Sequence, residues 1–275
     1  MSHTLNDGHS LPAIGFGTYP LRDPAGVDAM VSALHQGYRL IDSAVNYENE
    51  GAGGEAVRRS GIPRDEILVT SKLPGRHHAY ADAVTCVHES LYRMQLDHID
   101  LYLIHWPLPR VDRYVEAWQA LVDLQRDGLL RSIGVSNFLP EHLDRIIAET
   151  GVTPAVNQIE LHPYFPQELQ RQVDAERGIV TEAWSPLGRA GEVMRDPVVT
   201  GIAQAHGRTP VQVVLRWHLQ LGTLPLPKAA SASRQLENLS VFDFELDAAQ
   251  VAAITALGRP DGRLFGADPA THEEF

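Results

Sequence analysis

The sequence predicts an α/β protein with the architecture of a (β/α)8 TIM barrel, an N-terminal β-hairpin and extra helices. Eight short β-rich runs recur at intervals of roughly thirty residues, the size of one βαβ unit, and amphipathic stretches separate them. The chain has 275 residues, close to the roughly 250 of a typical barrel. Because no linker or low-complexity stretch interrupts the pattern, we expect a single barrel domain over residues 1–275.

The expected strands are short and apolar, and each ends in a polar or small residue. Several are unbroken apolar runs, which is typical of parallel strands that are buried on both faces. In chain order we expect them at residues 14–19, 39–43, 67–72, 99–106, 132–136, 155–160, 180–185 and 223–227.

Other local patterns predict the remaining elements. Asp7-Gly8 is a hairpin turn signal, and we expect this hairpin to close the bottom of the barrel. Segments 197–206 and 210–220 are helical, which is one helix too many between the last two strands. The chain after Gly258 is rich in glycine, proline and charge, which predicts a loop. Between the third and fourth strands we expect a helix, because these residues share one helical face: Tyr80, Val84, Val87, Leu91 and Met94.

Composition excludes several classes of protein. The 23 Lys and Arg against 35 Asp and Glu give a formal net charge of -12, which disfavours nucleic-acid and anionic-membrane partners. The single cysteine, Cys86, excludes an intramolecular disulfide and is typical of a reducing compartment. No apolar run approaches the roughly 20 residues of a membrane helix, and no signal-peptide pattern begins the sequence. We therefore expect a cytoplasmic monomer. We also expect no metal site, since no metal-ligand spacing occurs in the sequence.

Barrel enzymes carry their active sites at the carboxyl ends of the strands, so the polar residues at those ends are the first candidates. Asp42, Lys72 and His105 end three successive strands, and Tyr47 lies in the loop just after Asp42. Taken singly, each can equally be a rim ion pair or a hydrogen-bonded structural residue. What favours function is that four complementary side chains fall on successive strands.

These four side chains have a joint chemical use. A phenol with an ordinary pKa near ~10 is a poor proton donor at neutral pH, and a neighbouring ammonium is expected to lower that pKa. A carboxylate holds the ammonium in place, and an imidazole is able to orient a carbonyl group. The set suits protonation of an oxygen that gains negative charge, as in the reduction of a carbonyl by hydride.

Other polar residues at the rim suit a bound ligand. Ser136, Asn137 and Gln158 are able to bind a carboxamide, although serine and asparagine are also common turn formers. Trp184 is able to stack on a flat ring, or is a core aromatic. Lys228 and Arg234 are able to bind a phosphate, or are solvated surface cations.

The same residues lie in motifs that resemble those of the aldo-keto reductases from Gly15 to Phe244, most closely the compact prokaryotic type of the 2,5-diketo-D-gluconate reductase-like group. The motifs occur in the family's order. They are Gly15-Phe16-Gly17-Thr18, Asp42-Ser43-Ala44, Tyr47, Asn49-Glu50, Ser71-Lys72, Leu103-Ile104-His105-Trp106-Pro107, Gly134-Val135-Ser136-Asn137-Phe138, Asn157-Gln158, Glu160, His162-Pro163, Ser185-Pro186-Leu187-Gly188 and Pro227-Lys228.

The resemblance implies a barrel that binds NADPH without a Rossmann fold and reduces aldehydes and ketones to alcohols. It implies that Tyr47 is the general acid, that Lys72 and Asp42 assist it, and that His105 orients the carbonyl. Substrate-pocket candidates are Tyr19 and Trp106, with Phe265, Asn46 and Arg22 as further ones. The cofactor-binding residues that it implies are Gly17, Thr18, Ser136, Asn137, Gln158, Trp184, Ser185, Leu187, Lys228, Arg234 and Asn238.

Two departures from the family pattern matter. After Pro227-Lys228 the chain continues Ala229-Ala230, which removes one hydroxyl contact to the cofactor phosphate; we still expect NADPH, with NADH as a weaker alternative. The segment between His105 and the helix expected near Asp112 is short, which predicts an open pocket and a broad substrate range.

Two other functions remain open on the sequence. The same scaffold is able to serve as a nicotinamide-nucleotide-binding regulatory protein, or as a barrel enzyme of another class such as a hydrolase. A regulatory protein needs no proton donor, so the four complementary side chains disfavour it, and a hydrolase predicts no binding of NADPH.

Overall fold

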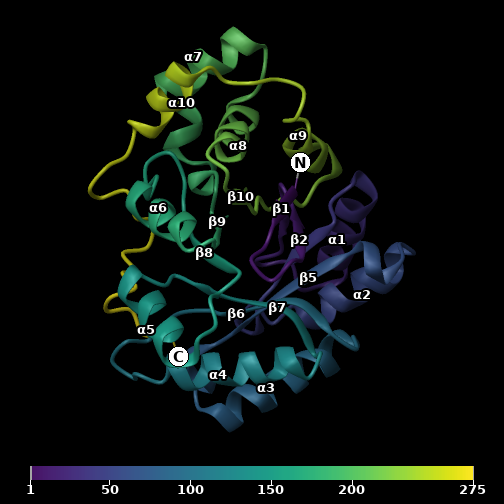
Figure 1. The fold of residues 1–275 in the computed structure, drawn as a ribbon. Coiled ribbons are helices and arrows are strands. Elements are labelled where there is room, and N and C mark those ends of the chain that lie inside the picture. The colour runs from purple at the N-terminus through teal and green to yellow at the C-terminus, as the bar shows by residue number, and fades with distance from the viewer. Residues whose placement is uncertain (1, 275) are drawn as a thin grey trace.

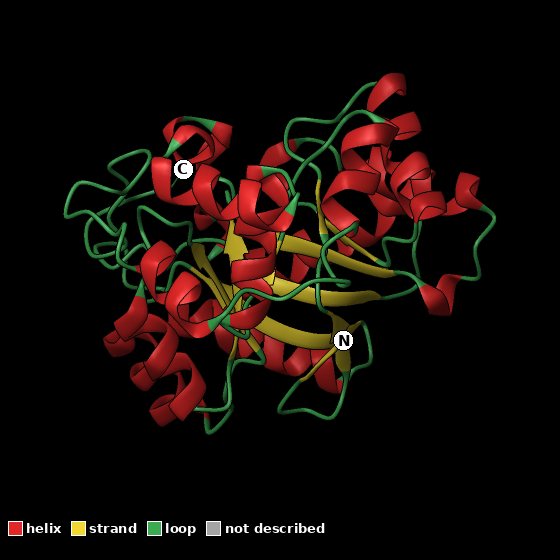
Figure 2. Ribbon diagram, turned by 90° about the horizontal axis from the view of Figure 1, so that it is seen from above, coloured by secondary structure: helices red, strands yellow, loops and turns green. Residues whose placement is uncertain are grey.

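The computed structural model describes residues 2–274, and its centre is a sheet of eight parallel strands surrounded by helices (Figures 1 and 2). The order of the strands in the sheet follows the chain, and each strand overlaps one of the runs expected from the sequence. The predicted (β/α)8 class is therefore confirmed. The strands are β3 Phe16–Gly17, β4 Leu40–Asp42, β5 Leu68–Leu73, β6 Ile99–Ile104, β7 Leu130–Ser136, β8 Val156–Glu160, β9 Val180–Trp184 and β10 Leu224–Pro225.

The first and last strands of the sheet join and close the barrel. The backbone N–H groups of Gly15 and Gly17 donate to the carbonyl oxygens of Pro225 and Pro227, at 3.1 and 3.2 Å. A Cβ atom on Gly17 would lie only 2.7 Å from the carbonyl oxygen of Leu226, so this close approach requires glycine. Proline has no N–H to donate in return, which explains why β3 and β10 are shorter than the sequence predicts.

The N-terminal hairpin pairs β1 Ser2–Thr4 with β2 Ser10–Pro12 in antiparallel fashion. Leu5 and Leu11 from the hairpin are buried with residues that begin the barrel strands, Leu40 and Leu224 among them. The hairpin therefore closes the end of the barrel opposite the strands' carboxyl ends, as expected.

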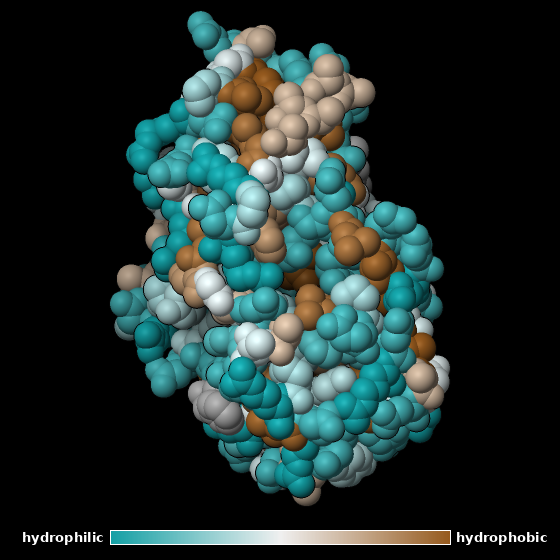
Figure 3. Space-filling model, turned by 90° about the vertical axis from the view of Figure 1, so that its left-hand side faces the viewer, coloured by the Kyte–Doolittle hydropathy of each residue, from teal (hydrophilic) through white to brown (hydrophobic). Residues whose placement is uncertain are grey.

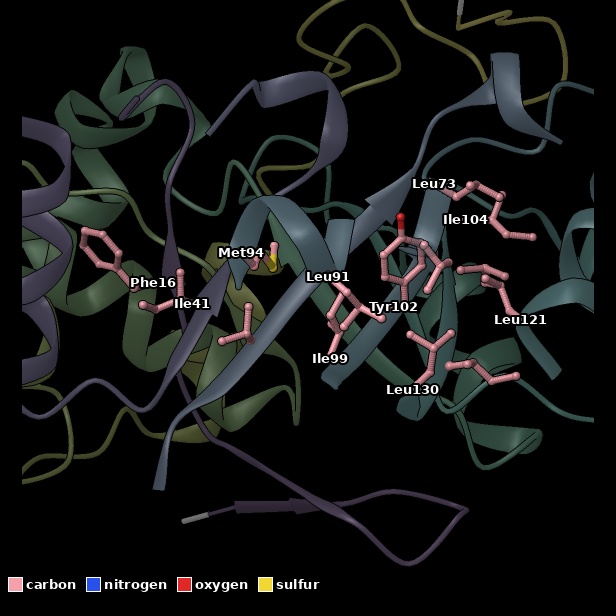
Figure 4. Close-up of a cluster of buried hydrophobic side chains, with 14 of the residues drawn as sticks. Phe16, Ile41, Leu73, Leu91, Met94, Ile99, Tyr102, Ile104, Leu121 and Leu130 are labelled. Atoms are coloured by element: carbon pink, nitrogen blue, oxygen red, sulfur yellow. The ribbon is translucent and has the colours of Figure 1, made fainter. Parts of the chain in front are cut away.

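The helices pack around the sheet, and the main hydrophobic core lies between the two layers. Figure 4 shows part of it: Leu91 and Met94 of α3 belong to the same cluster as Tyr102 of β6. The expected apolar face of α3 is wrong only for Tyr80, which lies at the helix start, 43% exposed. The helices are α1 Pro24–Gln36, α2 Glu50–Ser60, α3 Tyr80–Met94, α4 Tyr114–Arg126, α5 Pro140–Thr150, α6 Glu168–Glu176, α7 Pro197–His206, α8 Pro210–Gln220, α9 Ala232–Leu239 and α10 Ala248–Thr255.

The last described segment, residues 256–274, contains no helix or strand, in agreement with the expected loop. In Figure 1 it is the yellow trace that leaves α10 and runs along the left side toward α4 and α5. This segment, called the tail below, ends beside the carboxyl ends of the first barrel strands. Within residues 2–274, no helix has the length and apolar character needed to cross a membrane.

The packing of α2 on the end of α3 yields a stability prediction. A Cβ atom on Gly54 would lie 2.0 Å from the carbonyl oxygen of Met94, whereas a Cβ on Gly53 would meet nothing within 4 Å. We expect Gly54→Ala to lower the free energy of unfolding by about 1–3 kcal/mol through overpacking. Gly53→Ala, the matched control, should raise it by about 0.5–1 kcal/mol, because alanine favours the helix. Denaturant unfolding measures both, and equal effects of the two variants would contradict the packing.

Candidate active site

Three neighbouring strands carry the polar residues that the sequence singles out. Asp42 ends β4, Lys72 is next to the end of β5, and His105 directly follows β6. Tyr47 ends the short 3-10 helix Val45–Tyr47, which follows β4. Since β4, β5 and β6 are adjacent and parallel, their carboxyl ends bring these four side chains to one rim of the barrel.

Lys72 is fully buried and uses its ammonium group on three sides. Nζ donates to both carboxylate oxygens of Asp42, at 2.7 and 2.8 Å, and to the carbonyl oxygen of Ser43 at 2.8 Å. Its third partner is the hydroxyl of Tyr47 at 3.5 Å. A buried ammonium group needs hydrogen-bond partners for all of its N–H groups, and here one of those partners is the phenol of Tyr47.

Burial and charge act in opposite directions on Lys72 and Tyr47. Burial lowers the pKa of Lys72, but Asp42, with Tyr47 and Glu182, together outweigh burial, so the net pKa lies above its usual value. Burial raises the pKa of Tyr47; Lys72 opposes this only in part, and the net pKa is raised. Lys72 thus lowers the pKa of Tyr47 as expected, but desolvation of the phenolate is the larger effect and sets the net direction.

His105 lies beside Tyr47, with the two ring centroids 5.8 Å apart in an edge-on arrangement. Its Nδ1 atom lies 2.8 Å from Oε1 of Glu274, which belongs to the tail. Glu274 could not be found from the sequence, because no local pattern connects a loop carboxylate to a strand end so far away in the chain.

A pocket of about 800 Å³ opens at this rim. It adds to the expected set Pro20, Pro186, Arg189, Ala190, Leu226 and Pro227, mostly small or apolar residues of the flanking loops. Expected residues that line it are Gly17, Thr18, Tyr19, Asp42, Tyr47, His105, Trp106, Asn137, Gln158, Trp184, Ser185, Leu187, Lys228 and Phe265.

The amides expected to bind a carboxamide are held firmly. Asn137 donates to the carbonyl oxygen of His105 at 3.0 Å and accepts from the indole N–H of Trp184 at 2.8 Å. Gln158 accepts at its backbone carbonyl from the hydroxyl of Ser136 at 2.8 Å. Ser136 is itself fully buried and does not line the pocket; its hydroxyl accepts from Nδ2 of Asn137 at 3.0 Å and so links that amide to the backbone of Gln158.

Glu182 of β9 is a second residue that the sequence analysis missed, although a charged residue inside an apolar strand is a visible signal. Nε2 of Gln158 donates to Asp42 at 3.0 Å and to Glu182 at 2.8 Å, which links the two carboxyl groups. Burial, and then the charge of Asp42, raise the pKa of Glu182 to about 8. Glu182 is therefore mostly protonated at neutral pH.

Some expected residues do not reach the pocket wall. Lys72 lies behind Asp42 and Tyr47. Arg234 is exposed on α9, and Asn238 is buried on the same helix, against Tyr38. Arg22 pairs with Glu48 on the surface.

The lysines of the chain are concentrated near the pocket. The chain contains two lysines, Lys72 and Lys228, and both lie at this end of the barrel, one buried and one exposed at the rim.

The tail forms part of the pocket wall through Phe265, whereas the openness of the pocket stays a prediction. The segment after β6 is indeed short, since α4 begins at Tyr114. The room that it leaves is occupied by the tail: the rings of His272 and Trp106 are 4.3 Å apart, and Phe265 lies 6.2 Å from Trp184. The face of the molecule shown in Figure 3 is mostly hydrophilic, with separate apolar areas.

The raised pKa of Glu182 predicts a pH-dependent stability. Because the folded-state pKa of about 8 exceeds the ordinary value near ~4.3, the protonated acid stabilises the fold at low pH. That contribution is lost as the pH rises through about 8. Glu182→Gln should therefore have a higher free energy of unfolding than the wild type at pH 9, by on the order of a few kcal/mol, and this difference should shrink toward pH 5. Denaturant unfolding at the two pH values measures it. The exposed Glu176→Gln is the control, and a difference independent of pH would refute the assignment.

Comparison with known proteins agrees with this geometry. Residues 13–259 match the model of the aldo/keto reductase family. The chain is 55% identical over 272 residues to 2,5-diketo-D-gluconic acid reductase B of Corynebacterium sp. (strain SHS752001), covering 99% of this chain and 98% of that relative.

Solved structures that resemble this one include complexes with the nicotinamide cofactor. A Gox0644 variant in complex with NADPH superposes with a TM-score of 0.94 at 43% identity, covering 99% of this chain and 98% of that one. The Bombyx mori aldo-keto reductase in complex with NADP superposes with a TM-score of 0.90 at 32% identity, covering 100% and 98%. The chain, with its closed barrel and polar rim, therefore belongs to the aldo/keto reductase family and is an NADP-dependent oxidoreductase.

Proposed function

We propose that this pocket reduces small aldehydes or ketones to alcohols and that Tyr47 is the general acid. The observation that carries the proposal is the contact between the buried ammonium of Lys72 and the Tyr47 hydroxyl, 3.5 Å apart. Asp42 holds that ammonium at 2.7 Å, so its charge is fixed beside the phenol. Such an arrangement stabilises the phenolate that proton donation leaves behind.

The residues of the pocket suit a nicotinamide cofactor by their chemistry. Asn137 and Gln158 offer amide groups, Trp184 offers a flat aromatic ring, and Lys228 offers an exposed cation at the rim. When bound, the cofactor supplies the hydride. We infer that the first two hold its carboxamide, that Trp184 packs on its ring and that Lys228 binds a phosphate.

The proton and the orientation of the substrate come from the protein. His105 and Tyr47 lie side by side on the pocket wall, so a carbonyl oxygen placed between them contacts both. Since the pKa of Tyr47 is raised, the phenol keeps its proton at neutral pH until the oxygen gains negative charge. The phenol then gives up its proton, and Lys72 remains charged beside the phenolate.

We further infer a monomer that acts in the cytoplasm on a small-molecule carbonyl, without nucleic-acid or membrane partners. Support comes from the net charge of -12 and from the single cysteine. Cys86 is buried, and burial raises the pKa of its thiol to about 11, so it is an unreactive thiol.

Tyr47→Phe tests the general acid. We expect NADPH-dependent reduction of a simple aldehyde to fall by about 10²–10⁴-fold, because the variant keeps the ring and loses the proton donor. NADPH binding, followed by fluorescence titration, should be retained. Tyr19→Phe is the matched control, since Tyr19 lines the same pocket with its ring centroid 5.2 Å from that of Tyr47, and it should lose far less activity. Full activity of Tyr47→Phe would refute the proposal, and NADPH binding without turnover by the wild type would favour a regulatory protein.

Lys228→Ala tests the choice of cofactor. Loss of a charge-assisted hydrogen bond to phosphate costs about 1.5–3 kcal/mol, so we expect the KM for NADPH to rise by about 10–100-fold. The KM for NADH should change by less than about threefold, because NADH lacks the extra phosphate. Arg126→Ala, an exposed cation on α4 that pairs with Asp123, is the control. Equal changes with both cofactors would place Lys228 at the diphosphate that NADH and NADPH share rather than at the extra phosphate of NADPH.

A further inference from the structure

The backbone of Asn137 has a left-handed conformation at the wall of the pocket. Its φ angle is 63°, in a region where residues other than glycine are uncommon. Asparagine adopts this region more readily than most residues, but the conformation persists only where the surrounding structure holds it. The side chain of Asn137 is constrained as well, because it donates to the carbonyl oxygen of His105 and accepts from the indole N–H of Trp184. The placement of this amide therefore depends on what fixes the backbone next to it.

Asn157 of β8 holds the backbone directly after Asn137. Its Nδ2 atom donates to the carbonyl oxygen of Phe138 at 3.0 Å, and its Oδ1 atom accepts from the backbone N–H of Phe138 at 3.4 Å. The backbone N–H of Asn137 itself donates to the carbonyl oxygen of Gln158 at 2.9 Å. One amide side chain thus pairs with both backbone groups of Phe138, as a neighbouring strand would, at the point where the chain leaves β7.

Asp174 fixes the orientation of the Asn157 amide. It lies on α6, the helix that packs on β9 (Figure 1), and it is fully buried. Its Oδ1 atom accepts from Nδ2 of Asn157 at 3.1 Å and from Nε2 of Gln170 at 2.9 Å, and its Oδ2 atom accepts from the hydroxyl of Thr181 at 2.9 Å. Burial raises the pKa of Asp174 to about 6, so the carboxyl group is mostly ionised at neutral pH and only accepts hydrogen bonds. The NH2 side of Asn157 must therefore face Asp174, which leaves Oδ1 to the N–H of Phe138.

Asn157 has no direct access to the pocket. Its side chain is fully buried, and neither Asn157 nor Asp174 lines the pocket wall. Because successive side chains of a strand point to opposite faces, Gln158 enters the barrel while Asn157 points outward toward α6. An effect of Asn157 on a bound cofactor therefore passes through the backbone of Phe138 and Asn137.

We propose that Asn157 is a positioning residue for the cofactor: it holds the left-handed backbone of Asn137 so that the Asn137 amide meets the carboxamide of the nicotinamide. The proposal rests on the function proposed above, in which Asn137 is one of the residues that hold this carboxamide. Asp174 orients Asn157, and Trp184 keeps its place through the bond from its indole to Asn137. A buried polar cluster on the outer face of the sheet thereby sets the geometry of the pocket inside it.

Asn157→Ala tests the proposal through the Kd of two ligands, NADPH and adenosine 2′,5′-bisphosphate, which has no nicotinamide. We expect the Kd for NADPH to rise by about tenfold, as for one misplaced hydrogen bond, and the Kd for the fragment to stay within about twofold. Fluorescence titration measures the first and calorimetric titration the second. Asn157→Ser, whose side chain is too short to pair with both backbone groups of Phe138, should act in the same direction and replaces the alanine variant if that one does not fold.

Thr181→Val is the matched control. Thr181 is buried and donates to the other oxygen of Asp174, so this variant disturbs the same cluster without removing the bonds to Phe138. Both Asn157→Ala and Thr181→Val should unfold at a lower denaturant concentration than the wild type. Only Asn157→Ala should weaken NADPH binding at a temperature where both variants are folded, and equal weakening in Thr181→Val would reduce the role of Asn157 to general stability.

A double-mutant cycle tests whether the effect passes through Asn137. In an Asn137→Ala background, Asn157→Ala should change the Kd for NADPH by less than about twofold, because the residue through which it acts is gone. Folded Asn157 variants that bind NADPH as the wild type does, or that bind the fragment equally poorly, would overturn the proposal, as would a loss that persists in the Asn137→Ala background. An Asn137→Ala variant with wild-type affinity for NADPH would instead refute the cofactor placement in the proposed function.

Discussion

The ammonium group of Lys72 lies inside the barrel without contact with solvent, and the carboxylate of Asp42 makes this burial tolerable. Removing either partner would leave the other as an uncompensated buried charge, which typically costs several kcal/mol. The same pair also sets the position of its neighbours. Lys72 reaches Tyr47, and Asp42 accepts from Gln158, so the proposed proton donor and one proposed cofactor ligand both depend on it.

The carboxylate of Asp42 also disfavours a second negative charge inside the barrel, at Glu182. Glu182 is linked to Asp42 through Gln158, and a second carboxylate there would face an already compensated site. Burial and the charge of Asp42 disfavour the ionised form of Glu182 and raise its pKa to about 8, so the side chain stays protonated below that pH. At the rim the balance is the reverse, because Glu274 has His105 as a partner and remains ionised. The pKa values of two glutamates near one pocket therefore shift in opposite directions, because burial dominates at Glu182 whereas the neighbouring groups outweigh burial at Glu274.

Much of the fold could be predicted from local pattern. Runs of apolar residues at regular intervals located all eight strands, and the two helical segments expected at 197–206 and 210–220 have the bounds of α7 and α8. The extents of β3 and β10 could not be predicted, because they depend on how Gly17 meets Pro227 across the closure of the barrel. Likewise Tyr80 falls on the apolar period of α3, but its hydroxyl reaches Asp123 at the surface.

By itself, the sequence determined that Asp42, Lys72 and His105 meet, because the carboxyl ends of successive parallel strands always share one rim. It also determined the family, through motifs spread along the chain. The tertiary structure alone decided that the tail forms part of the pocket wall, that Glu274 faces His105 and that burial outweighs Lys72 in setting the pKa of Tyr47. These outcomes depend on the path of a loop and on the loss of water around each charge, and neither is encoded in the spacing of residues along the chain.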